Sequence, residues 1–270
     1  MQRRILIIDD HDDLATSLSE AFSHTGHFVH VVGERDEALA IDDIESYDLV
    51  LTDLDVKNLT KATSLNGNAK VCLPKTLDAS HFGEHIKAFK ICAANFRRDD
   101  FDEEELKSLV ATILDYKIRY VDKEDFVADL HENIEFEMPS AISLMHIVLE
   151  YLMKRVEKNG VVKAEQSNLF VALDEAFVNA IKHGNKYDAK KLVRISAEIS
   201  SKEARFTIED EGDGFDVRGI PDPLDPENLF KTSGRGVLFI HNIMDEVTYN
   251  QRGNQVTMVK KAPAPDEKPA

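Results

Sequence analysis

The chain has 270 residues, which corresponds to roughly two domains at about 150 residues each, and its 43% hydrophobic content can form a core in both. The 50 acidic and 33 basic side chains leave a formal net charge of −17, which opposes binding to nucleic-acid phosphates and anionic membrane surfaces. No secretory segment and no bilayer-spanning apolar run is recognisable, so we expect a soluble, cytoplasmic protein without direct membrane or nucleic-acid contacts. Cys72 and Cys92 are too few for a disulfide framework and are interpreted as buried thiols.

In the first half of the chain, short apolar runs alternate with helical stretches. Such runs, apolar on both faces, are typical of buried parallel strands, and alternation with helices indicates an α/β fold with a doubly wound parallel sheet over residues 1–116. The apolar spacing predicts a last helix near 103–116. The predicted strands cover 5–8, 29–32, 49–51, 71–73 and 89–92.

A charged stretch over 117–133 predicts a linker to the second half, which we assign to 134–261, with a disordered tail over 262–270. The second half is expected to begin with a strand near 134–138. Ser140 is the predicted N-cap of a helix to about Glu157, and a helix from about Lys163 to His183 is expected to end in a left-handed Gly184-Asn185. Further strands are predicted at 193–199, 204–209 and 255–260.

Three aspartates follow predicted strands of the first half. Asp9 and Asp10 come after the first strand, and Asp53 ends the third. Because carboxyl ends of parallel strands meet at one edge of a sheet, these carboxylates would repel one another unless a cation such as Mg²⁺ lay among them. The alternative is that single aspartates cap the helices that follow the strands.

On the second helix of the second half, Glu175 and Asn179 are four residues apart and share one face, with His183 a turn further on. A carboxylate and an amide in this arrangement could hold a cation and orient a nucleophile. Polar residues at this spacing are also common on solvated helix faces, so the pair alone leaves both interpretations open.

Asp210 leaves a predicted strand and is followed by Gly212 and Gly214, which allow the backbone to approach a flat ring closely. A calcium loop or a plain hairpin turn would also contain such residues, but the distal glutamate and flanking helices of an EF-hand do not fit here. The long Gly-, Pro- and Asp-rich stretch that follows, 210–233, indicates a functional loop.

A second glycine pair precedes a helical run. Gly234, Arg235 and Gly236 lead into this run, where free backbone amides and the helix dipole favour a phosphate. Three features follow one another along the chain: the polar pair Glu175 and Asn179 on one helix face, the Asp-Gly turn at 210–214 and the glycine segment 234–236. Together, in this order, they predict a nucleotide site.

Residues 134–261 resemble the GHKL-type ATPases and, within them, the serine-kinase anti-sigma factors. The resemblance rests on 175–183 as the N box, 210–216 as the G1 box and 234–236 with 244–247 as the G2 region. It implies an α/β two-layer sandwich with a mixed sheet that binds ATP and Mg²⁺. The implied roles are adenine recognition by Asp210, Mg²⁺ binding by Asn179, general-base catalysis by Glu175, and nucleotide contacts by Gly212, Gly214, Gly234, Arg235 and Gly236.

The same resemblance implies phosphorylation of a Ser or Thr on a STAS-type anti-anti-sigma partner, binding of a sigma factor, and a homodimer. Asn254 stands where the family usually has Thr, so a contact from Asn254 to adenine is left open. A sensor histidine kinase shares these boxes, but His131-Glu132 lacks the nearby proline of its phosphoacceptor helix, and His131 is interpreted as a linker residue.

Residues 3–116 resemble the receiver domains of response regulators. The resemblance makes Asp53 the acceptor of a phosphoryl group from an upstream histidine kinase, with Asp9 and Asp10 holding Mg²⁺. The family's lysine falls on Asp99, or on Lys75 in another register, and its Thr or Ser falls near Pro74, so phosphorylation is left open. The domain order implies a receiver-controlled serine/threonine kinase; the alternative is a non-catalytic module that sequesters a sigma factor or another regulator.

Overall fold

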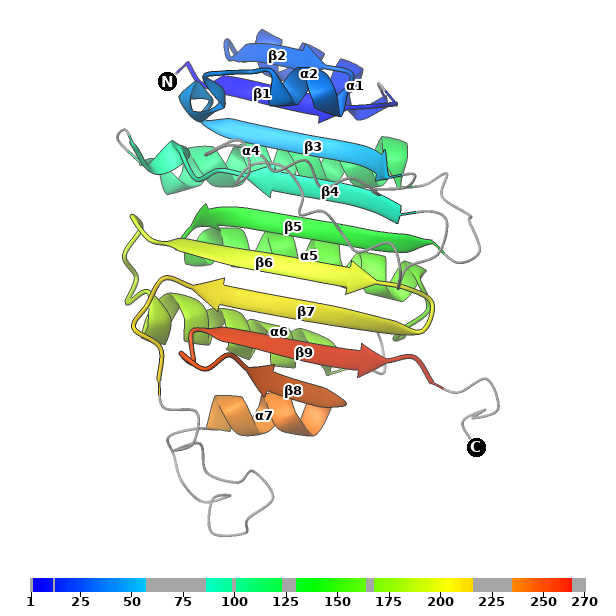
Figure 1. Ribbon diagram of the computed structural model, residues 1–270, viewed down its shortest axis with the longest axis vertical. Helices are drawn as coiled ribbons and strands as arrows, with labels where there is room; N and C mark the ends of the chain where they lie inside the picture. The colour runs from blue at the N-terminus through cyan, green and yellow to red at the C-terminus, as the bar shows by residue number, and fades with distance from the viewer. Residues whose placement is uncertain are drawn as a thin grey trace. The chain divides into compact units, whose positions relative to one another are not determined.

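The computed structural model describes residues 2–11, 13–56, 86–98, 101–122, 130–163, 168–215 and 235–263 (Figure 1). The chain divides into two compact units, Met1–Pro139 and Ser140–Ala270. Within the described ranges, no helix combines the length and the apolar character that a bilayer crossing requires.

The first unit is built on a mixed sheet in which the strands lie in the order β2-β1-β3-β4-β5. β1 pairs in parallel with both β2 and β3, β3 pairs antiparallel with β4, and β4 pairs in parallel with β5. The strand bounds are β1 (Arg4–Asp9), β2 (Phe28–Val32), β3 (Leu49–Val56), β4 (Ile86–Cys92) and β5 (His131–Pro139).

Helix α4 (Glu103–Tyr116) is confirmed within its predicted bounds. Asp102 caps it by accepting hydrogen bonds from the backbone amides of Glu104 and Glu105. Its apolar stripe is buried, as the spacing predicts: Leu106, Leu109, Val110, Ile113 and Leu114. The other helical elements of the unit are α1 (Asp13–His24), α2 (Arg35–Leu39), η1 (Ile44–Ser46), η2 (Phe96–Arg98) and the π-helical η3 (Lys117–Val121).

The prediction of an all-parallel sheet is wrong at β3 and β4, which run antiparallel from Val50 opposite Cys92 to Val56 opposite Ile86. A strand buried on both faces is a continuous apolar run in either direction, so the run at 89–92 located the strand without fixing its sense. β3 also continues to Val56, so Asp53 lies inside this strand and does not end it. The predicted strand at 71–73 lies outside the described residues.

The expected linker over 117–133 differs from the structure at both of its ends. η3 continues helix α4 from Lys117, and residues 131–133 begin β5, which pairs with β4. The boundary between the compact units falls at Pro139 and Ser140. The strand predicted at 134–138 is confirmed and is longer than expected.

The second unit has a sheet in the order β6-β7-β9-β8, and all its described pairings are antiparallel. Figure 1 shows α5 and α6 on one face of this sheet. The strands are β6 (Leu192–Ile199), β7 (Glu203–Asp210), β8 (Glu246–Tyr249) and β9 (Gln255–Lys261). The helical elements are α5 (Ile142–Lys158), α6 (Leu169–Val178), the π-helical η5 (Asn179–Gly184) and α7 (Arg235–Ile243).

Two predicted helix termini are corrected. Ala141, not Ser140, is the N-cap of α5, and the hydroxyl of Ser140 donates instead to the carbonyl of Lys191 at 3.2 Å. The left-handed residues after η5 are Lys186 and Tyr187, two positions beyond the predicted Gly184-Asn185. Strand β8 was not predicted, and the tail lies outside the described residues from position 264 onward.

Candidate functional site

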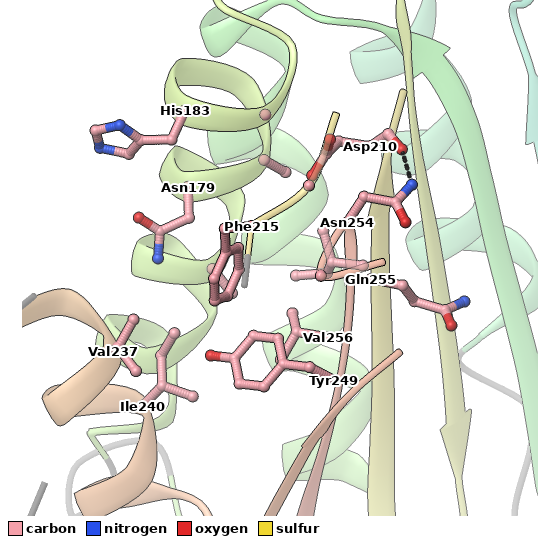
Figure 2. A pocket seen from close by; sticks show the side chains of 16 residues that line it. Asn179, His183, Asp210, Phe215, Val237, Ile240, Tyr249, Asn254, Gln255 and Val256 are labelled. Atoms are coloured by element: carbon pink, nitrogen blue, oxygen red, sulfur yellow. Dashed lines mark hydrogen bonds between the residues drawn. The ribbon is translucent and has the colours of Figure 1, made fainter. Parts of the chain in front are cut away.

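A cavity of about 260 Å³ lies in the second unit, between the α6–η5 helix, the carboxyl end of β7, helix α7 and the strands β8 and β9 (Figure 2). Its walls are largely apolar, with a few polar groups that point into it, which is the usual character of a small-molecule site. The labelled lining residues in Figure 2 are Asn179, His183, Asp210, Phe215, Val237, Ile240, Tyr249, Asn254, Gln255 and Val256.

Asp210, at the end of β7, is held on several sides. Its Oδ1 accepts a 2.7 Å hydrogen bond from the amide of Gly212, and its own backbone amide donates to the carbonyl of Asn254 at 3.0 Å. Burial raises the pKa of Asp210 above its ordinary value, and the Gly212 amide offsets part of this effect. Within the described ranges, no side chain forms an ion pair with this carboxylate.

Gly184, the last residue of η5, forms the surface against which the Asp210 carboxyl group packs. A Cβ atom at position 184 would overlap Cγ and both carboxylate oxygens of Asp210. Only glycine allows this approach, so Gly184 helps to fix where the carboxylate lies. Gly214 also lines the cavity, beside Phe215.

Asn254 precedes β9 and uses both ends of its amide within the chain. Its Nδ2 donates to the carbonyl of Asp210 at 2.7 Å, and its Oδ1 accepts from Nδ2 of Asn250 at 2.9 Å. These bonds hold the backbone of Asp210 in place. A contact from Asn254 to adenine stays a prediction, while its described role is to support Asp210.

Phe215 and Tyr249 form an aromatic wall of the cavity. Their ring centroids are 5.5 Å apart at an interplanar angle of 75°. Burial raises the pKa of Tyr249 to about 12, so its hydroxyl stays neutral at physiological pH. Tyr249 belongs to β8 and was missed by sequence reasoning; the alternation in Glu246–Tyr249 is a four-residue signal, which is at the short end for a strand.

The structure brings Glu175, Asn179 and Gly236 together. A Cβ atom at position 236 would overlap Oε2 of Glu175 and would lie 3.7 Å from Nδ2 of Asn179. Helix α7 begins at Arg235, so Gly236 lies inside its first turn rather than before it. Gly234 and the side chain of Arg235 lie outside the described residues.

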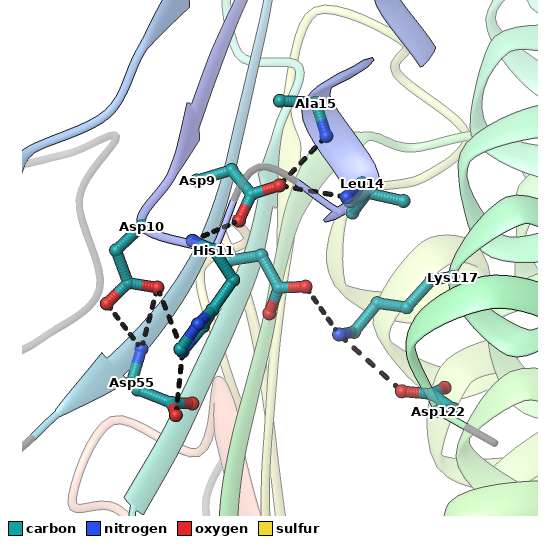
Figure 3. A network of polar contacts seen from close by, with 9 residues as sticks. Asp9, Asp10, His11, Leu14, Ala15, Asp55, Lys117 and Asp122 are labelled. Carbon is teal, nitrogen blue, oxygen red and sulfur yellow. Dashed lines mark hydrogen bonds and ion pairs between the residues drawn. The ribbon is translucent and has the colours of Figure 1, made fainter. Parts of the chain in front are cut away.

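In the first unit, Asp9 caps helix α1 (Figure 3). Its Oδ2 accepts hydrogen bonds from the backbone amides of Leu14 at 3.0 Å and Ala15 at 2.8 Å. This contact is the capping alternative that the sequence left open. Asp10 accepts from the amide of Asp55 at 3.0 Å, so both carboxylates already have backbone partners.

Asp53 is buried in β3 and forms an ion pair with Lys117, whose Nζ lies 2.7 Å from its Oδ2. The same ammonium group is 3.5 Å from Asp122 and 4.7 Å from the centroid of the Phe89 ring. Burial raises the pKa of Asp53, and the charge of Lys117 opposes this shift. Lys117 was not predicted as a site residue, because it is one lysine in a charged stretch interpreted as a linker.

In the described part of the chain, no group of three or more His, Cys, Asp or Glu side chains is arranged to hold a metal ion. Magnesium binding by Asp9, Asp10 and Asp53 therefore stays a prediction, and an ion there would displace contacts that these carboxylates already make. The family's lysine position at Asp99, its alternative at Lys75 and the Thr or Ser position near Pro74 all lie outside the described residues.

Comparison with known proteins matches the second unit. Residues 138–260 fit the sequence model of the histidine kinase-like ATPase domain. The serine-protein kinase RsbW of Staphylococcus aureus (strain JH9) is 30% identical over 149 residues, which cover 51% of this chain and 87% of that protein. The serine-protein kinase RsbW of Staphylococcus epidermidis is 28% identical over 138 residues, covering 47% of this chain and 85% of that protein.

Proposed function

Because the chain belongs to the family of the RsbW-type serine-protein kinases and is an ATP-dependent serine/threonine kinase, we propose that the cavity of the second unit is its ATP site, with Asp210 recognising the adenine base. The observation that carries this proposal is the buried Asp210 carboxylate, which lines an otherwise largely apolar cavity. An ionised carboxylate only accepts hydrogen bonds, and the exocyclic amine of adenine donates them. The aromatic wall of Phe215 and Tyr249 provides apolar surface for a flat ring.

The groups at the other end of the cavity suit the phosphates. Asn179 offers an amide oxygen, a ligand type that Mg²⁺ accepts, and lies beside Gly236 in the first turn of α7. We assign Mg²⁺ to Asn179 and the phosphate contacts to Gly234, Arg235 and Gly236. Bound Mg²⁺ would neutralise phosphate charge during transfer.

Glu175 is the proposed general base. Its carboxylate lies against Gly236, and Gly236 is also next to Asn179, which lines the cavity. In the proposed reaction, the hydroxyl oxygen of a Ser or Thr forms a bond to the γ-phosphorus, the bond to the β-phosphate oxygen breaks, ADP leaves, and the hydroxyl proton passes to Glu175.

The proposed substrate is a STAS-type anti-anti-sigma protein, and the proposed regulated partner is a sigma factor. Both follow from the anti-sigma resemblance and from the relatives named serine-protein kinase. The test is transfer of labelled phosphate from ATP to a candidate STAS protein. Glu175→Gln is expected to lower the transfer rate by about 10²-fold or more while ATP affinity is kept, and Glu150→Gln on the exposed face of α5 should leave it unchanged. Tight partner capture without transfer would instead favour the sequestering module.

A specific observation favours a regulatory role for the first unit. Asp9 and Asp53 stand directly opposite each other in the parallel β1–β3 pair, and the local strand order is β2-β1-β3. We propose that this unit is a receiver-like input in which Asp53 accepts a phosphoryl group from an upstream histidine kinase. Acetyl phosphate is expected to modify the wild-type protein and change its kinase rate, and Asp53→Asn should abolish both effects. Equal kinase rates with and without the phosphodonor would remove the switch.

A further inference from the structure

Asn185 is a fully buried polar residue that the sequence analysis did not select for function. It directly follows η5, and its side chain has no exposed surface. Its Nδ2 donates to the hydroxyl of Ser140 at 2.6 Å and to the carbonyl of Leu192 at 2.9 Å. Its Oδ1 accepts from the backbone amide of Glu211 at 2.8 Å. One carboxamide thus joins the segment before α5, the start of β6 and the turn after β7.

These partners fix the orientation of the amide. If oxygen and nitrogen were exchanged, two donors would face each other at Glu211 and two acceptors at Leu192. The bond to the Leu192 carbonyl is buried and the bond from the Glu211 amide is part-buried, so removal of the side chain would leave both backbone groups without these partners.

The bond to Glu211 acts on Asp210. The backbone of Asp210 is held on its own amide and carbonyl by Asn254, and the amide of the next residue is held by Asn185. Gly184, which directly precedes Asn185 in the chain, forms the surface against which the Asp210 carboxylate packs. Asn185 therefore fixes the turn and the packing surface relative to each other.

We propose that Asn185 is the positioning residue for base recognition, which holds the Asp210 carboxylate where it accepts a hydrogen bond from adenine and rejects guanine. The proposal rests on the proposed ATP site. Guanine carries a carbonyl oxygen at the position of the adenine amine, so a correctly placed carboxylate faces an acceptor and repels it. A carboxylate that is free to turn away would lose this discrimination.

The test compares ATP with GTP for the full-length protein and Asn185→Ala. The readout is the dissociation constant for GTP divided by the dissociation constant for ATP. A smaller folded fraction would weaken the apparent binding of both nucleotides equally, so its effect cancels in this ratio. The ratio is expected to fall by about tenfold, mainly through weaker ATP binding, as for the loss of one well-placed hydrogen bond. Where Asn185→Ala does not fold, Asn185→Ser is read by the same ratio.

Arg194→Met is the matched control. Arg194 forms an ion pair with the side chain of the same Glu211 at 2.9 Å and is about one-third exposed, while the Glu211 amide stays with Asn185. This variant should keep the wild-type ratio. A folded Asn185 variant with a ratio within about twofold of wild type, on the same scale of one hydrogen bond, would overturn the proposal.

Asp210→Ala separates this proposal from the proposed function. If Asp210→Ala loses the preference for ATP and Asn185→Ala keeps it, only the positioning role is refuted. If Asp210→Ala itself keeps both affinity and preference, the proposed base recognition fails. In the Asp210→Ala background, Asn185→Ala is expected to add no further change, because the two residues act through one contact.

Discussion

Asp53 in the first unit and Asp210 in the second are buried strand aspartates whose pKa values are both raised by burial. They differ in their partners. Asp53 is paired with an ammonium group of its own chain at 2.7 Å, whereas the oxygens of Asp210 meet a backbone amide and line a cavity. A buried carboxylate that already has a counter-ion in its own chain is costly to leave unpaired, and one that faces a cavity without a described ion pair is suited to a ligand.

The largest effect is expected on stability, at the buried ion pair between Asp53 and Lys117. Lys117→Met removes the counter-ion of Asp53 and leaves a buried charge, which should lower the free energy of unfolding by about 3–5 kcal/mol. Denaturant unfolding measures this change. Lys107→Met, which breaks an exposed 3.4 Å pair with Glu104, is the control and should cost at most about 1 kcal/mol. Adding Asp53→Asn to Lys117→Met should recover part of the lost stability, because it removes the unpaired charge. If Lys117→Met alone lowers the free energy of unfolding no more than the Lys107→Met control does, the comparison is refuted.

The second prediction concerns Gly236, which packs against Glu175 beside the part of the cavity that is assigned to the phosphates. Gly236→Ala places a methyl group on Oε2 of Glu175 and should displace this carboxylate, lowering kcat for phosphotransfer by up to about 10²-fold. KM for ATP should rise by less than kcat falls, because the proposed phosphate contact of Gly236 is disturbed while the proposed contact of Asp210 with the base is kept. Steady-state kinetics separate the two, and an unchanged kcat would argue against Glu175 as the base.

The third prediction concerns the base end. Gly184→Ala should push the Asp210 carboxylate away from its packing surface and raise the dissociation constant for ATP by about tenfold. Gly160→Ala is the control, because a Cβ there meets no atom within 4 Å although its φ is +77°. It can lower stability, but ATP affinity measured by calorimetry should stay at the wild-type value. Equal affinities for both variants would contradict the role of Asp210.

The smallest effect is the pH dependence of ATP binding. Burial raises the pKa of Asp210 above 3.8, so as pH falls the carboxylate is protonated earlier than an ordinary aspartate and ATP affinity should fall with it. The same raised pKa has the opposite effect on folding stability. A raised carboxyl pKa contributes stability below the unfolded pKa, and this contribution is lost as pH rises through the folded pKa. The slope of affinity against pH should flatten in Asp210→Asn; an equal slope would assign it to another group.

Local patterns predicted much of the fold. The apolar stripe of α4 placed the helix at 103–116, and the alternation of polar and apolar residues placed β6, β7 and β9 within about one residue. The sense of β4 could not be predicted, because strand direction depends on chain connections and not on burial.

The candidate site was predicted where its residues are close in sequence. Glu175 and Asn179 share one helix face, and Asp210 and Gly212 share one turn, so spacing brought each pair together. Lys117, Tyr249 and Asn185 reach their sites through tertiary packing. A lone lysine, tyrosine or asparagine carries no periodic signal of such a contact, so only the fold identifies them.

The central claim is that the second unit holds ATP through the Asp210 carboxylate. Calorimetric titration of the full-length protein with ATP and Mg²⁺, beside Asp210→Ala, tests it most directly. We expect binding by the wild type and a loss of about 10- to 100-fold in the variant, the range for a hydrogen bond to a charged group. Absence of binding by the wild type, or equal affinity in the two proteins, would contradict the claim.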